Sequence, residues 1–154
     1  MEYQVELREI QPRFVARAGG SCPASAVGDT LTRVLLPRVY QFLAARRIAP
    51  AGPPIALYHE FSADRARLEG AVPVDATFDG DDEVQPGALP GGRVATTRHV
   101  GPYHELGAAH DAVVRWIRDR GYRAVRPNWE VYPMPPGGEP DPARLVTEIY
   151  WPIG

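Results

Sequence analysis

The chain has 154 residues, a formal net charge of −2, and contents of 44% hydrophobic and 23% charged residues. This composition is that of an ordinary globular chain, and the length suits one domain with one sizeable core. We therefore predict a single domain over residues 1–154. The basic residues are arginines, mostly placed singly, and this scatter argues against a nucleic-acid-binding surface.

Cysteine content, the N-terminal pattern and the length of apolar runs indicate the cellular location. Cys22 is the one cysteine, so no intrachain disulfide can form and a reducing compartment is the simpler interpretation. The N-terminal stretch MEYQVELREI alternates and is charged, unlike the apolar core of a signal peptide. No run of eighteen apolar residues occurs. We expect a cytoplasmic protein without membrane contact.

The first half begins with an alternating pattern that predicts a strand over Tyr3–Ala18, with Pro12 as a bulge or edge device. The glycines and proline of residues 19–23 predict a loop. Apolar residues at helical spacing then predict a helix over Ala24–Ile48. Pro37 removes a backbone donor inside that helix, so we expect a kink or a break there.

Two further strands complete the first half. Ile55–Phe61 and Leu68–Val74 are rich in strand-forming residues, and Ser62–Arg65 is their predicted turn. A segment rich in Asp and Gly, Asp79–Gly92, is predicted as the loop that links the two halves.

The second half repeats the same order of elements. Arg93–Val100 is a predicted strand, VGPY a turn, and His104–Arg120 a helix with Gly121 just past its end. The strands Asn128–Met134 and Arg144–Pro152 follow, separated by a Pro/Gly loop over residues 135–142.

The halves, about residues 1–78 and 84–154, can be aligned. At one offset of 79, Val15-Ala16 falls on Val94-Ala95 and Glu69 falls on Glu148, and Tyr58 matches Tyr132 after a small shift. We therefore predict an α+β fold in which two pseudo-symmetric strand-helix-strand-strand modules form antiparallel sheets. Their seam would hold a central ligand cleft.

Alternation assigns the faces of these strands. Three predicted strands carry a tyrosine and a glutamate on one face: Tyr58 with Glu60, Glu130 with Tyr132, and Glu148 with Tyr150. The same pattern is typical of an antiparallel sheet with one solvated face. Three such pairs favour a different interpretation, because a solvated face more often carries Lys, Arg or Thr. Aromatic rings around a carboxylate suit a lipophilic or cationic guest, with cation–π attraction of about 0.5–2 kcal/mol.

Other sites find little support. The four histidines show no metal-ligand spacing and have no cysteine partners, so we expect no metal and no cofactor. His110 lies near the apolar stripe of its helix, which favours packing over catalysis. The serines lie outside any nucleophile-elbow pattern, and no phosphate-binding loop pattern is present.

A family resemblance follows from the order of several short motifs. The turn HVGPYHEL, the strand WEVY and the C-terminal LVTEIYWPI, together with GPPIALYHEF and LEGAVPV in the first half, resemble GyrI-like domains. These domains are also known as the effector-binding domains of AraC- and MerR-type multidrug regulators. The resemblance covers nearly the whole chain and implies two pseudo-symmetric modules that enclose a ligand cleft.

The resemblance also implies site residues. In multidrug-binding relatives an acidic residue ringed by aromatic side chains meets cationic guests, and Glu130 matches that residue best. The implied aromatic walls are Tyr132, Trp129, Tyr58 and Tyr103. Alternation agrees for Glu130 and Tyr132, whereas it puts Trp129 on the opposite face. The alternation also makes Glu148 and Tyr150 candidate ligand-binding residues.

Three functions remain open at this stage. The first is a protein that sequesters or senses an aromatic, drug-like small molecule, cationic or neutral. The second, implied by freestanding relatives, is a hydrolase that opens the cyclopropane ring of strained natural products, with Glu130 as general base and Tyr132 assisting. The third is a gyrase-inhibitor-like interaction module. Because no DNA-binding segment accompanies these motifs, we expect no direct contact with nucleic acid.

Overall fold

A computed structural model describes residues 2–134 and 139–154 of the chain. The chain forms two compact units. The first unit comprises Gln11–Gly91, and the second comprises the segment up to Ile10 together with Gly92–Gly154. Residues 135–138 of the predicted Pro/Gly loop lie outside the described part. Within the described part, no helix has the length and apolar character needed to cross a membrane.

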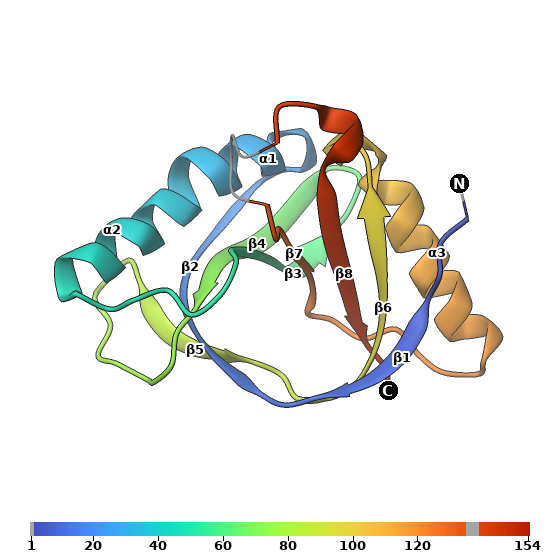
Figure 1. Cartoon of the computed structure of the whole chain (residues 1–154), viewed down its shortest axis with the longest axis horizontal. Coiled ribbons are helices and arrows are strands. Elements are labelled where there is room, and N and C mark those ends of the chain that lie inside the picture. Colours follow the sequence, from blue (N-terminus) through green and yellow to red (C-terminus); the bar gives the residue numbers. More distant parts are fainter. Residues whose placement is uncertain (1, 135–138) are drawn as a thin grey trace. The chain divides into compact units, whose positions relative to one another are not determined.

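The first unit is an antiparallel sheet with the strand order β5-β2-β4-β3 (Figure 1). Its strands are β2 (Arg13–Pro23), β3 (Ile55–Phe61), β4 (Arg65–Pro73) and β5 (Gln85–Leu89). The predicted loop over residues 19–23 is wrong, because β2 continues through these residues and pairs with β4 as far as Pro23. Cross-strand hydrogen bonding thus overrides the local turn preference of the glycines.

The predicted first helix is confirmed as a helical run, but its irregularity precedes Pro37. The run consists of η1 (Ala24–Ala26), α1 (Val27–Thr30), the π-helical turn η2 (Leu31–Leu35) and α2 (Leu36–Arg46). In a regular helix the ring of Pro37 would clash with the carbonyl four residues earlier. A π-helical turn changes the bonding ladder just before the proline, as the bond from Leu36 N–H back to the carbonyl of Leu31 shows.

The helical run packs on β4 at Gly70. A Cβ at this position would lie 3.0 Å from Cβ of Leu35 and 3.2 Å from the backbone nitrogen of Leu36. The Gly70→Ala substitution is therefore expected to lower the free energy of unfolding by about 1 kcal/mol through overpacking. Urea unfolding measures this change. In the control Gly107→Ala, a Cβ would meet no atom within 4 Å, so a loss of equal size there would contradict the packing argument.

The second unit has the strand order β1-β6-β8-β7, again antiparallel. Its strands are β1 (Glu6–Ile10), β6 (Gly92–Val100), β7 (Asn128–Val131) and β8 (Val146–Pro152). The helical elements are η3 (Tyr103–Glu105), α3 (Leu106–Asp119) and η4 (Pro142–Arg144). The strand predicted over Asn128–Met134 is shorter than expected, since its pairing with β8 reaches only Val131.

Helix α3 covers one face of the second unit's sheet. Its buried residues recur at helical spacing and form one apolar cluster with the sheet: Leu106, Ala109, Val113 and Ile117 pack with Ala95, Ile149 and Trp151. The helix ends where Gly121 adopts a positive φ of 78° and Tyr122 N–H bonds the carbonyl of Ile117 at 3.1 Å. Glycine tolerates this left-handed conformation without steric cost.

The internal repeat is confirmed by the pairing registers. In the first unit Val15 lies opposite Pro73, and in the second unit Val94 lies opposite Pro152, both at the predicted offset of 79. The registers on β4 and β8 also make Ala56 of β3 the counterpart of Glu130 of β7. The buried carboxylate of Glu130 is therefore a feature of the second unit, and the repeat does not copy it.

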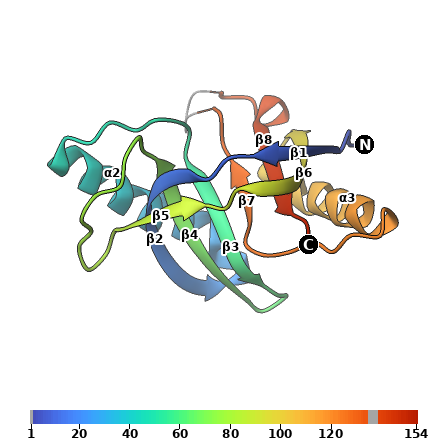
Figure 2. The ribbon, with the colours of Figure 1, turned by 90° about the horizontal axis from the view of Figure 1, so that it is seen from below.

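The edge strands depart from the predicted elements. The predicted strand Tyr3–Ala18 divides at Gln11-Pro12, and its first part, β1, pairs with β6 of the second unit. The predicted loop Asp79–Gly92 contains β5, which pairs with β2 of the first unit. Figure 2 shows β1 beside β6 and β5 beside β2. The sequence pattern does not predict β5, because it contains Pro86 and Gly87 and neither residue favours a strand.

Candidate functional site

The candidate site is centred on Glu130 in β7. Glu130 lies opposite Ile149 of β8, and Ile149 belongs to the apolar cluster under α3. Directly opposed residues of antiparallel strands share a face, so Glu130 points to the side of the sheet that α3 covers. Its side chain is only 6% exposed.

Hydrogen bonds from two side chains fix the carboxylate of Glu130. The hydroxyl of Tyr132 donates to Oε1 at 2.5 Å, and Nε2 of His110 on α3 lies 2.6 Å from Oε2. Behind the histidine, the indole N–H of Trp151 donates to Nδ1 of His110 at 3.0 Å. One chain of hydrogen bonds thus runs from β8 through α3 to β7.

The polarity of this chain follows from the donors it contains. An indole N–H only donates, and an ionised carboxylate only accepts. The bond from Trp151 therefore makes Nδ1 of His110 an acceptor, which leaves the ring proton on Nε2, where it is donated to Glu130. His110 in this arrangement is neutral. His110 and Tyr132 thus satisfy oxygens of Glu130 without cancelling its negative charge.

Aromatic rings extend outward from the carboxylate. Tyr103 of η3 packs edge-on against Tyr132, with ring centroids 5.8 Å apart and planes at 72°. Tyr103 is 46% exposed, so it forms the outer ring of the group. Burial and, second, the negative charge of Glu130 raise the pKa of the Tyr103 hydroxyl above its ordinary value. The two tyrosines therefore lie within the field of Glu130.

Thr147 adds a polar group to the same face of β8. It lies two residues before Ile149, so the side chains of both residues point to the face of the sheet that α3 covers. Its Oγ1 is buried and has no hydrogen-bond partner among the described residues. Buried hydroxyls are usually satisfied, so Thr147 is an exception among the described residues.

Three other predicted site residues lie on the opposite face of the same sheet. Trp129 and Tyr150 are directly opposed and stack with ring centroids 5.5 Å apart and planes at 12°. The hydroxyl of Tyr150 donates to Glu148 at 3.3 Å. Burial and the charge of Glu148 raise the pKa of Tyr150. Trp129, Tyr150 and Glu148 therefore form a second aromatic group, which the sheet separates from Glu130.

Tyr58 belongs to the first unit. It is buried in β3 opposite Leu68, and its ring meets Phe61 edge-on at 5.9 Å. The predicted set of seven ligand-binding residues thus divides into the Glu130, Tyr132 and Tyr103 group, the opposite-face group, and Tyr58. The role of these seven residues in ligand binding stays a prediction.

His110 and Trp151 were missed as site residues. Alternation correctly puts Trp151 on the face opposite Tyr150, and the stripe of α3 correctly puts His110 near the buried side. The missed signal was a polar ring on the inner side of a helix that covers a strand bearing a glutamate. The described residues contain no group of three or more His, Cys, Asp or Glu side chains that could hold a metal ion.

Comparison with known protein families identifies the class of domain. The model of the GyrI-like small molecule binding domain matches residues 33–154. The chain therefore belongs to the GyrI-like family and is a small-molecule-binding domain of that family. No curated protein sequence is similar enough to the chain to count as a match.

Solved structures share the fold. The C-terminal domain of EcmrR is 23% identical with a TM-score of 0.88, and the match covers all of this chain and 99% of that domain. The chain spans 57% of EcmrR in its DNA complex, at 22% identity, TM-score 0.86 and 98% coverage of this chain.

Two other similar structures are less close. SAV2435, solved with bound tetraphenylphosphonium, is 16% identical with a TM-score of 0.67, covering all of this chain and 94% of that one. A hydrolase encoded by lin2189 from Listeria innocua is 14% identical with a TM-score of 0.67, covering 98% and 92%. At these identities the likeness concerns the fold.

Proposed function

We propose that the domain binds aromatic, lipophilic cations at Glu130 and thereby sequesters or senses them. The observation that carries this proposal is the pair of neutral donors, His110 and Tyr132, on a buried carboxylate. Neither donor carries a positive charge, so an ionised Glu130 receives no counter-ion from them in this poorly solvated place. Such a charge attracts a cation more strongly than an exposed carboxylate does, because the surroundings screen it less.

The tyrosines supply the aromatic part of the proposed site. Tyr132 is half-buried beside Glu130, and Tyr103 is half-exposed and packs against Tyr132. A guest approaching from the Tyr103 side meets two ring surfaces before it reaches the carboxylate. Rings of this kind offer apolar area together with cation–π attraction.

The relatives support a cationic guest and leave both physiological uses open. SAV2435, which has the same fold, was solved with tetraphenylphosphonium, an aromatic phosphonium cation. EcmrR, which also shares the fold and of which this chain spans 57%, was solved in complex with DNA. We propose that binding to Glu130 is the step common to sequestration and sensing.

Hydrolysis of a strained electrophile is the second candidate function, favoured by the hydrogen bond between Tyr132 and Glu130. In this reaction Glu130 takes a proton from water while the water oxygen bonds to a ring carbon. The ring C–C bond breaks, its electron pair passes into the acceptor group of the substrate, and the resulting anion takes up the proton from Glu130 to complete the addition of water. The Tyr132 hydroxyl steadies that developing negative charge. The lin2189 hydrolase shares the fold and supports this candidate.

Mass spectrometry separates the two candidates. The protein is incubated with tetraphenylphosphonium and, separately, with a cyclopropane-bearing electrophile, and both are recovered after denaturation. Binding predicts intact compounds, with the phosphonium retained by the native protein. A product heavier by one water, formed by the wild type and absent with Glu130→Gln, would establish hydrolysis in place of simple binding. Recovery of the phosphonium only in the unbound fraction would refute the binding proposal.

A further inference from the structure

The first unit carries a hollow of about 360 Å³ on the sheet face opposite its helices. Its lining comes from three neighbouring strands: Arg17, Gly19, Gly20 and Ser21 of β2, His59 of β3, and Arg67, Leu68 and Glu69 of β4. Gly19 lies opposite Glu69 in the register of β2 and β4. Because Gly19 has no side chain, the surface is open at this point. Its counterpart in the second unit at the offset of 79 is Arg98, which lies opposite Glu148.

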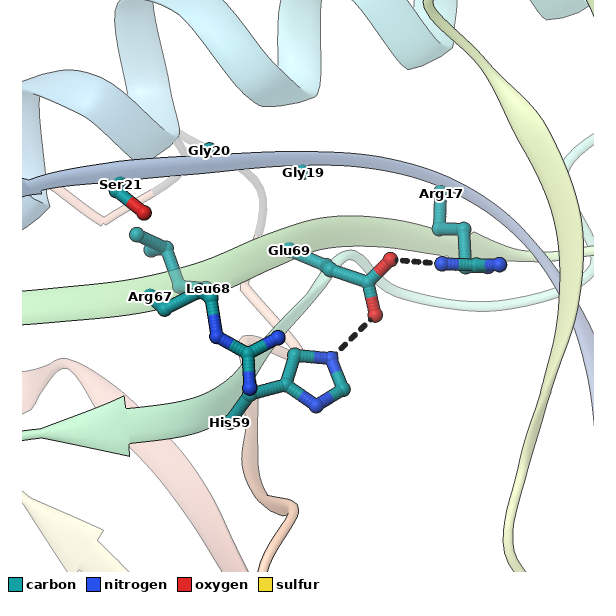
Figure 3. A pocket seen from close by; sticks show the side chains of 8 residues that line it. All are labelled: Arg17, Gly19, Gly20, Ser21, His59, Arg67, Leu68 and Glu69. Atoms are coloured by element: carbon teal, nitrogen blue, oxygen red, sulfur yellow. Dashed lines mark hydrogen bonds and ion pairs between the residues drawn. The ribbon is translucent and has the colours of Figure 1, made fainter.

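Glu69 is the centre of the hollow, and its charge is already matched. Figure 3 shows its carboxylate directed between Arg17 and His59. Nη1 of Arg17 forms an ion pair with Oε2, and Nε2 of His59 lies 2.6 Å from Oε1. Burial acts to raise the pKa of Glu69, but the hydrogen bonds from His59 and Arg17 and the charge of Arg17 outweigh it, so this pKa lies below its ordinary value.

Arg17 is held in place before any ligand arrives. Its Nε donates to the carbonyl of Pro86 at 3.3 Å, and its Nη1 meets Glu69. A Cβ at Gly87 would lie 2.5 Å from Nε of Arg17, so the guanidinium packs where only glycine leaves room. An arginine ordered in advance loses less conformational entropy when it binds a ligand.

The remaining polar groups of the hollow are mainly donors. Arg67 makes a long contact, 3.7 Å, to the exposed Glu60, and the hydroxyl of Ser21 lines the hollow as a further donor. The lining has two arginines against one glutamate, and the second carboxylate nearby, Glu60, is exposed and lies outside the lining. A surface with spare N–H and O–H donors and a positive charge suits an acceptor-rich anion.

We infer that this hollow is a second binding site, independent of Glu130, that takes a small oxyanion, either a carboxylate or a phosphate group. Arg67 and the free edge of Arg17 would hold the oxyanion above Gly19, with Ser21 as a further donor. Glu69 is a positioning residue that orients Arg17 and His59. The inference rests on the first unit alone. Its test is independent of the test of the proposed function.

A titration followed by ¹H–¹⁵N NMR tests this inference. The probes are inorganic phosphate and acetate, each added at constant pH and at an ionic strength held constant with chloride. Saturable shifts are expected at the amides of Gly19, Ser21 and Arg67. Tighter binding of phosphate than of acetate would indicate a phosphate-bearing ligand, and the reverse order a carboxylate. The absence of saturable shifts with both probes would overturn the inference.

Two variants and one control locate the site. Arg67→Gln removes an exposed charge that the fold does not need, and it should weaken the probe about tenfold, as expected for one charge-assisted hydrogen bond. Gly19→Val keeps every charge and fills the hollow, and it should abolish the saturable shifts. The control Arg65→Gln removes the same charge from the same strand outside the hollow. Equal weakening by Arg67→Gln and Arg65→Gln would show mere screening and would contradict a site.

Discussion

Replacing Glu130 with glutamine is expected to weaken the binding of tetraphenylphosphonium by about 1–3 kcal/mol, roughly 5- to 150-fold in Kd. The amide keeps the shape of the side chain. Its oxygen can accept from Nε2 of His110, and its NH₂ can donate to the Tyr132 oxygen, because that hydroxyl can rotate. The fold should therefore survive, and the loss should reflect the missing charge. Isothermal titration calorimetry measures it.

A neutral guest and a matched variant make this prediction specific. Triphenylphosphine oxide carries similar rings without a positive charge, so its affinity should change little in Glu130→Gln. The control Glu148→Gln removes an equal charge from the opposite face of the sheet, and it should leave phosphonium binding within about twofold. Equal losses for both guests would show that Glu130 supports the fold and not the charge match. A loss confined to Glu148→Gln would assign the cation to the Trp129 and Tyr150 face.

Replacing His110 with leucine is expected to lower the free energy of unfolding by about 1–3 kcal/mol. The substitution removes the Nε2 donor from a carboxylate that is only 6% exposed. It also leaves the indole N–H of Trp151 without the acceptor that it now uses. Both groups would remain buried with a hydrogen bond missing, which costs more than the bond itself contributes. Urea unfolding at neutral pH measures the change.

A double-mutant cycle tests whether the two residues act together. Glu130→Leu with His110→Leu replaces both partners by apolar groups, and such replacement is often nearly neutral. The double variant should therefore lose less stability than the two single variants added together. Additive losses would mean that His110 packs against α3 and the sheet without supporting Glu130.

Local patterns in the sequence predict much of the fold. Apolar spacing predicts both helical regions, and the offset of 79 between Val15 and Val94 predicts equivalent registers in the two units. Edge strands escape this approach. The partner of β1 lies more than eighty residues away, on β6, and nothing within Glu6–Ile10 specifies it. Strand partners are chosen by long-range packing, which a local pattern does not contain.

The candidate site is predictable only in part, for a related reason. Alternation within a strand puts Glu130 and Tyr132 on the same face of one predicted strand, and Glu148 and Tyr150 on the same face of another. It does not say whether these two faces lie on the same side of the sheet. The register between β7 and β8 sets Trp129 against Tyr150 and so turns the two glutamates to opposite faces. His110 reaches Glu130 from α3 because of how the helix packs on the sheet. Register and packing therefore divide a set of residues that alternation alone makes equivalent.

A crystal structure of the wild-type protein with tetraphenylphosphonium tests the central claim most directly. The account predicts the cation in the second unit, in contact with the carboxylate of Glu130 and the rings of Tyr132 and Tyr103. Tyr103, the outer ring, should move to admit it, while His110 should keep its hydrogen bonds to Glu130 and Trp151. A cation bound against Trp129 and Tyr150, or in the hollow of the first unit, with the Glu130 hydrogen bonds undisturbed, would contradict the account.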